Sequence, residues 1–135
     1  MNRRLALALT VTDLLFLTYW GVSALDALGL ISVPADLLFA GHDEPRVVAW
    51  NWSFLPLDLA FSILGLSAVR AARAGLGVWR PLALMSLVCT MIAGGMAVAY
   101  WGLLGEFDPA WFLPNLALLI WPMAFLPVLV RDMSR

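Results

Sequence analysis

Four apolar stretches, each about as long as a bilayer is thick, constrain this chain more than any other feature. They cover residues 5–25, 52–69, 81–104 and 112–130. A transmembrane helix needs roughly 20 mostly apolar residues. The whole chain is 63% hydrophobic and 13% charged, whereas a soluble domain is roughly 45–50% apolar and about 25% charged. The sequence therefore predicts one all-α domain, residues 1–135, that forms a four-helix bundle inside a membrane.

The positions of the basic residues predict how these helices are oriented. In a four-span chain only Arg46 falls on one side, and the other side holds Arg3, Arg4, Arg70, Arg73, Arg80, Arg131 and Arg135. Because Arg-rich loops stay in the cytoplasm, both termini are expected inside. The absence of Lys indicates a bacterial chain, and hence the inner membrane. A cleaved signal peptide is the alternative for residues 5–25, but this stretch is too long and contains Asp13.

Composition and motifs exclude several classes of function. A net charge of −1 gives no reason to expect nucleic acid as a partner. The single cysteine, Cys89, excludes an intrachain disulfide, and the chain carries no haem, zinc or nucleotide motif, so no cofactor is expected. His42, Asp43 and Glu44 are adjacent in the loop 31–51. Adjacent residues rarely face one ion, so a solvated acidic loop is favoured over a metal site.

Two short motifs recur in the same order along the chain. The triplet YWG ends the first and third stretches, and FLP begins the second and fourth. This echo favours two duplicated helical hairpins related by an axis along the membrane normal. The alternative is chance, since aromatic residues are common at membrane interfaces.

A helical period of 3.6 residues places the polar side chains of each stretch on one face. Lipid cannot satisfy polar groups, so these faces are expected to turn inward and meet. The four predicted faces are Thr12, Tyr19, Ser23 and Asp26; Asn51, Leu55, Asp58, Ser62 and Gly65; Ser86, Thr90, Ala93, Ala97 and Tyr100; and Trp111, Asn115 and Pro122.

Asp58 lies inside the second stretch, and no Arg occurs within eleven residues of it. At 1.5 Å per residue it lies roughly 9 Å below the outer surface, at the depth of aromatic residues on the other helices. In such a place a carboxyl can donate a proton, bind a cationic ligand or tie helices together. The sequence predicts an aromatic-walled ligand pocket in the outer half of the bundle, formed by Asn51, Trp52, Asp58, Ser62, Tyr19, Trp20, Tyr100, Trp101, Trp111 and Asn115.

Asp13 is the second carboxylate inside an apolar stretch. It lies roughly 12 Å from the inner surface, at a height comparable to that of Thr90. Asp13 and Thr90 therefore form a predicted secondary polar site. One interpretation is an interhelical hydrogen bond, and the other is a polar path that links Asp13 to Asp58.

Small residues between Ala93 and Ala99 make the third helix thin on several sides. Such residues let helix backbones approach closely. Packing within the chain, a homodimer and contact with another membrane protein are all compatible with this pattern.

Three motifs carry a resemblance to a known family. WNWSFLPLDL (residues 50–59), WRPLAL (79–84) and FDPAWFLPNL (107–116) resemble the YvaD-like family of small, uncharacterised bacterial membrane proteins. The resemblance extends over nearly the whole chain and implies a four-helix membrane fold without a known activity. In layout alone the chain is also similar to the emopamil-binding class, whose members hold sterol-like or cationic amphiphilic ligands.

Three classes of function stay open. The first is a site for a small apolar or amphiphilic molecule, either as a binding protein or as an isomerase or cyclase in which Asp58 is the catalytic acid. The second is an accessory subunit or assembly factor of a membrane complex. The third is a small transporter or proton path through Asp13 and Asp58. Because aromatic and acidic residues converge at one depth, the sequence favours the first class.

Overall fold

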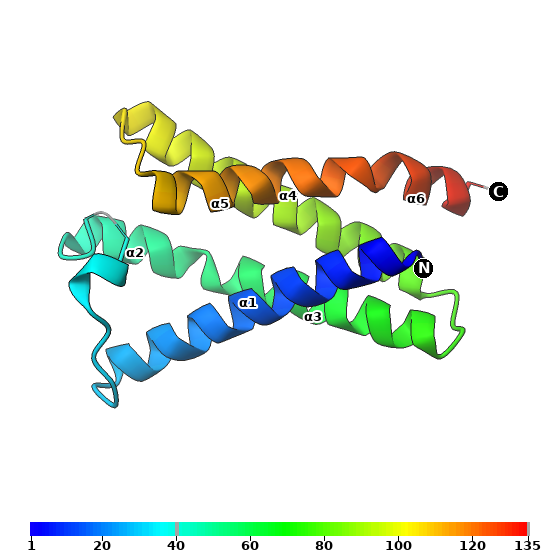
Figure 1. Ribbon diagram of the computed structural model, residues 1–135, viewed down its shortest axis with the longest axis horizontal. Helices are drawn as coiled ribbons and strands as arrows, with labels where there is room; N and C mark the ends of the chain where they lie inside the picture. Colours follow the sequence, from blue (N-terminus) through cyan, green and yellow to red (C-terminus); the bar gives the residue numbers. More distant parts are fainter. Residues whose placement is uncertain (40, 135) are drawn as a thin grey trace.

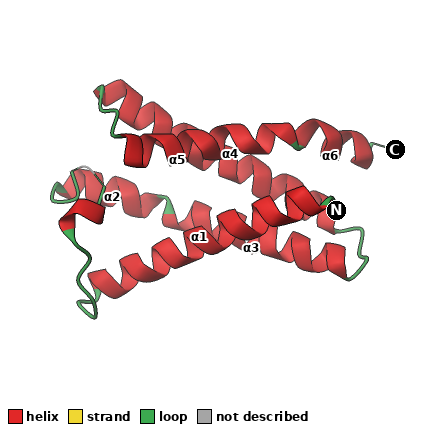
Figure 2. Ribbon diagram, viewed as in Figure 1, coloured by secondary structure: helices red, strands yellow, loops and turns green. Residues whose placement is uncertain are grey.

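The computed structural model describes residues 1–39 and 41–134, and every regular element in this part of the chain is a helix (Figure 2). Four segments are long and apolar enough to cross a membrane: Arg3–Ala27, Pro45–Arg73, Trp79–Leu104 and Pro109–Met133. They run alternately in opposite directions, so the N and C termini lie at the same end of the molecule (Figure 1). The predicted all-α architecture with four segments is confirmed.

The first and third segments are uninterrupted helices, as predicted. They are α1 (Arg3–Ala27) and α4 (Trp79–Leu104). At the start of α1, the Asn2 side chain accepts a hydrogen bond from the Arg4 backbone N–H at 2.8 Å. At the end of α4, Gly105 has a φ of 71°, the left-handed conformation that lets the chain turn out of the helix.

The second segment differs from the prediction of one helix over residues 52–69. It begins at Pro45 with α2 (Pro45–Ser53) and continues after Phe54 as α3 (Leu55–Arg73). Pro45 occupies the first turn, where its missing N–H costs nothing. Pro56 cannot donate a hydrogen bond to the preceding turn, which explains the break at Phe54. The preceding loop contains η1 (Ala35–Leu37), a short 3₁₀ helix.

The fourth segment is also broken, in contrast to the predicted helix over residues 112–130. It consists of α5 (Pro109–Ile120), the 3₁₀ turn η2 (Trp121–Ala124) and α6 (Leu126–Met133). Because α5 starts at Pro109, Pro114 lies inside the helix and not in its first turn as expected. Pro122 has no N–H for the α-helical ladder, which accounts for η2. Pro56 and Pro114 therefore occupy different helical positions, and the duplicated hairpins stay a prediction.

The helices pack in an arc and not in a closed square. α3 packs against α1 and α4, and α4 packs against α5 and α6. Among the described residues, the backbone of α1 stays more than 8 Å from the backbones of α4 and α5, measured between Cα atoms. The bundle is therefore open along the side between α1 and α5.

Gly94 sets the closest approach of α4 to α5. A Cβ at this position would lie 2.6 Å from the Asn115 carbonyl oxygen and 2.7 Å from the Leu119 backbone nitrogen. A Cβ on the neighbouring Gly95 would contact the Leu119 side chain at 3.5 Å. The small residues of α4 thus serve packing within the chain.

The interior contains two apolar clusters with a polar layer between them. The cluster near the termini includes Leu9 and Leu87, and the cluster at the opposite end includes Trp20 and Phe61. Asp13, Ser62, Ser86 and Thr90, which form the layer, are all completely buried. The predicted polar faces of α3 and α4 therefore turn inward. On α1 the prediction is wrong by one position: the buried residues are Leu5, Leu9, Asp13 and Trp20, and the predicted face of Thr12, Tyr19, Ser23 and Asp26 is only partly buried.

Candidate functional site

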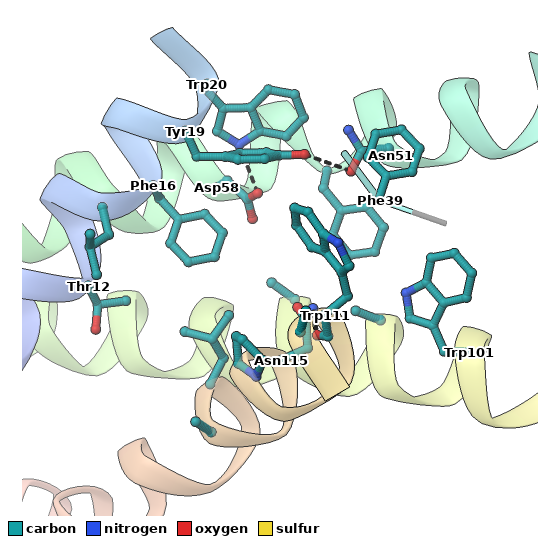
Figure 3. A pocket seen from close by; sticks show the side chains of 18 of the residues that line it. Thr12, Phe16, Tyr19, Trp20, Phe39, Asn51, Asp58, Trp101, Trp111 and Asn115 are labelled. Carbon is teal, nitrogen blue, oxygen red and sulfur yellow. Dashed lines mark hydrogen bonds between the residues drawn. The ribbon is translucent and has the colours of Figure 1, made fainter. Parts of the chain in front are cut away.

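A groove of about 430 Å³ occupies the open side of the bundle, in the half opposite the termini. Figure 3 shows side chains that line it. α1 and α5 form its two walls, and its floor comes from α2, α3 and α4. Most of the predicted pocket residues line it: Tyr19, Trp20, Asn51, Asp58, Trp101, Trp111 and Asn115. Its size falls in the range of small-molecule sites, roughly 300–1,000 Å³.

Asp58 is the acidic group of the groove and is only 3% exposed. Its Oδ2 accepts a hydrogen bond from the Trp20 indole N–H at 2.9 Å (Figure 3). Its Oδ1 is buried and has no hydrogen-bond partner in the described chain. Since Trp20 is itself 4% exposed and packed among aromatic rings, it fixes the orientation of the carboxyl. One oxygen is therefore satisfied by the protein, and the other is left for a donor from outside it.

Aromatic side chains close the end of the groove that faces away from the termini. The Tyr19 hydroxyl donates a hydrogen bond to Asn51 Oδ1 at 3.1 Å. The Tyr19 ring packs edge-on against Trp111, with centroids 6.2 Å apart, and Phe39 from the preceding loop packs on Trp111 at 6.2 Å. We call Tyr19, Phe39, Asn51 and Trp111 the roof. These contacts join α1, α2, α5 and the loop into one cover.

One part of the floor is built around Trp50, a residue of α2 that lines the groove. This ring stacks on Tyr100 at a centroid distance of 3.9 Å and packs edge-on against Trp101 at 5.6 Å. Tyr100 was predicted to line the pocket, but it lies behind Trp50 and supports it. The floor is therefore a two-layer aromatic stack that resists collapse into the groove.

Two other predicted residues also lie outside the groove. Trp52 packs against Trp20 at a centroid distance of 5.3 Å, and so supports the group that orients Asp58. Ser62 is completely buried one turn further along α3, with an Oγ that has no described partner. Asn115 does line the groove, but its amide nitrogen donates to the Trp111 carbonyl oxygen of its own helix at 2.7 Å. In the described chain, Asp58 Oδ1 is thus the buried acceptor of the groove without a partner, and Trp121 Nε1 is a buried donor without one.

Residues 5–135 match DUF5360, a family of unknown function. The chain belongs to this family. It is 38% identical to the uncharacterized protein YvaD of Bacillus subtilis (strain 168) over 133 residues, which cover 98% of this chain and 96% of that protein. No solved structure gave a significant match. The resemblance to the YvaD-like family is confirmed, and neither the DUF5360 family nor YvaD brings an activity to the chain.

Several groove residues of this DUF5360 protein were missing from the prediction. Trp50 and Phe54 lie eight and four residues before Asp58 on one helical row, a spacing that could have identified them. Phe16 lies one turn before Trp20 and could have been found in the same way. Phe39 belongs to a loop, and no periodic signal marks it.

The predicted secondary site consists of Asp13 and Thr90, and the structure separates their roles. The Thr90 hydroxyl donates to the Ser86 carbonyl oxygen of its own helix at 2.9 Å. Both Asp13 oxygens are buried without a hydrogen-bond partner in the described chain. Asp13 Oδ2 lies directly over Gly65, where a Cβ would collide with it. The interhelical hydrogen bond expected for Asp13 is therefore absent from the described residues, and the carboxyl fits where Gly65 leaves space.

Proposed function

We propose that this protein spans the cytoplasmic membrane of a bacterium and binds a small amphiphilic molecule in the groove through Asp58. The four long apolar segments support the membrane location. Large apolar side chains such as Leu7 and Leu15 are each 64% exposed, as expected of a surface that contacts lipid. A relative in Bacillus subtilis fits a bacterial membrane.

The distribution of arginine supports cytoplasmic termini. Among the described residues only Arg46 lies at the end opposite the termini (Figure 1). The terminal end carries Arg3, Arg4, Arg70, Arg73, Arg80 and Arg131. This asymmetry favours a cytoplasmic location for that end.

Thiol labelling in intact cells tests this orientation. In a Cys89→Ala background, we expect Glu106→Cys, between α4 and α5, to react with a membrane-impermeant maleimide. Leu76→Cys, in the exposed turn between α3 and α4, should react only after the cells are lysed. The reverse pattern would place the termini outside and refute the proposed topology.

The observation that carries the ligand proposal is the unpartnered Oδ1 of Asp58 beside an otherwise mostly apolar groove. A buried acceptor without a donor costs about 1–3 kcal/mol. A hydroxyl or ammonium group on a ligand would recover this free energy, and the aromatic rings would enclose its apolar body. The ligand is therefore a molecule with a donating head and an apolar tail.

Tryptophan fluorescence provides a direct test, because Trp20, Trp50, Trp101, Trp111 and Trp121 all line the groove. Bromine quenches an indole that it contacts. We expect saturable quenching of the full chain in phospholipid nanodiscs by ω-bromoundecylamine and ω-bromoundecanol. The matched anion ω-bromoundecanoate, at mildly alkaline pH, should quench only to the level of partitioning into lipid, because a second carboxylate beside Asp58 is repelled. Equal, non-saturable quenching by all three molecules would refute the ligand proposal.

A further inference from the structure

The wall of the groove contains a side opening formed by apolar residues. Leu15 of α1 lines the groove and is 64% exposed, and Pro114 and Ala117 of α5 line it and are also exposed. We call these three residues the mouth. They lie between α1 and α5, along the length of the helices and below the roof. In a spanning protein, this part of the surface faces the hydrocarbon of the bilayer.

The opening follows from the arrangement of the helices. α1 packs on α3 and α5 packs on α4, and in the described chain the backbones of α1 and α5 stay more than 8 Å apart. At the roof, by contrast, Tyr19 is hydrogen-bonded to Asn51 and packed against Trp111. The groove is thus covered toward water and open toward lipid.

The groove extends along the helices, from the roof toward the middle of the bundle. Asp58 lies at the level of Trp20, to which it is hydrogen-bonded. The lining of α1 continues from Trp20 back to Thr12, a distance of roughly 12 Å at 1.5 Å per residue. On α5 the lining runs from Trp111 toward Trp121, away from the roof. A polar head at Asp58 therefore leaves room for an apolar tail that points toward the middle of the bundle.

We propose that the ligand is a single-chain amphiphile dissolved in the bilayer, which reaches Asp58 sideways through the mouth with its donating head first. This inference rests on the proposed function and adds the source and shape of the ligand. An alkyl chain leaves hydrocarbon and enters an apolar groove without crossing water, so its transfer requires little free energy. A ligand that came from the aqueous side would have to separate the roof. A helix of a second copy or of another protein is the competing occupant of the open side.

Covalent staples distinguish these routes. In a Cys89→Ala background, Leu15→Cys with Ala117→Cys is bridged across the mouth by a bifunctional thiol reagent. Leu38→Cys with Pro109→Cys, which lie one residue before Phe39 and two before Trp111 and do not line the groove, is bridged across the roof as the matched control. Both full-length proteins are in nanodiscs, and ω-bromoundecylamine is added after stapling. The rate of tryptophan quenching is compared with that of each protein before stapling.

We expect the mouth staple to slow quenching by about tenfold or more, which corresponds to ~1.4 kcal/mol of added barrier. The roof staple should leave the rate unchanged. Sideways access is refuted if the roof staple blocks quenching, if neither staple has an effect, or if the mouth cysteines cross-link two copies of the chain. If the unstapled proteins are quenched only to the level of partitioning into lipid, the proposed function fails, and this result is distinct from a failure of the route alone.

Discussion

Asp58→Asn is expected to weaken binding of ω-bromoundecylamine by about 10- to 100-fold, because a hydrogen bond to a charged group contributes about 1.5–3 kcal/mol. The amide oxygen of Asn can still accept the hydrogen bond from Trp20, which lies 2.9 Å from Oδ2 in the wild type. The amide nitrogen, however, replaces an acceptor by a donor on the side that faces the ligand. The substitution thus removes ligand recognition and keeps the shape of the groove.

Binding is measured as saturable tryptophan quenching in nanodiscs, and folding as the midpoint of thermal unfolding. Asp132→Asn is the matched control, since it removes an exposed carboxylate on α6, a helix that contributes no residue to the lining of the groove. Its binding should equal that of the wild type. Unchanged affinity in Asp58→Asn would show that the carboxyl does not contact the ligand. A large fall in the unfolding midpoint would instead assign Asp58 a structural role.

The sequence was sufficient for the parts of the fold that depend on one helix at a time. Hydropathy located the four segments, and a 3.6-residue period showed that Asp58, Ser62 and Gly65 share a buried face. The same rule found the inward face of α4, but on α1 it chose Thr12 and Tyr19, each one residue before the buried Asp13 and Trp20. These features could be predicted because each depends on the hydropathy and the helical period of one segment alone.

Features that depend on which helices are neighbours could not be predicted in this way. Periodicity treats one helix at a time, so it does not say that, in the described chain, the backbone of α1 comes within 8 Å of that of α3 but not of those of α4 and α5. The groove exists because of that choice of neighbours. The same limit explains Tyr100 and Trp50: both are close to the predicted depth, but only the packed structure shows that Trp50 covers Tyr100.

Proline explains the errors in the helix boundaries. The hydropathy of residues 112–130 is continuous, so one helix was expected. Pro122 removes a hydrogen-bond donor in the middle of that stretch and produces η2. In a membrane, neighbouring helices tolerate such breaks, so an apolar run does not guarantee one regular helix.

The second large effect is expected at the contact between α1 and α3. Gly65→Ala should destabilise the protein by about 1–3 kcal/mol, because the interior there is already filled. The new Cβ would collide with Asp13 Oδ2 and would lie 2.9 Å from Ser86 Oγ. Neither side chain can retreat easily, since Asp13 and Ser86 are both completely buried. Unfolding in mixed micelles with increasing sodium dodecyl sulfate measures the loss.

Asp13→Ala in the same chain identifies the cause of that loss. If the carboxyl is the main obstacle, then the double variant Asp13→Ala/Gly65→Ala is more stable than the sum of the two single changes predicts, by about 0.5–3 kcal/mol. Gly102→Ala is the matched control, because a Cβ there meets nothing within 4 Å, and alanine favours a helix over glycine by about 0.5–1 kcal/mol. Strict additivity of the two changes would mean that Asp13 and Gly65 do not share one space. A positive coupling means that Gly65 is what allows a carboxyl without a partner to lie at the centre of an apolar bundle.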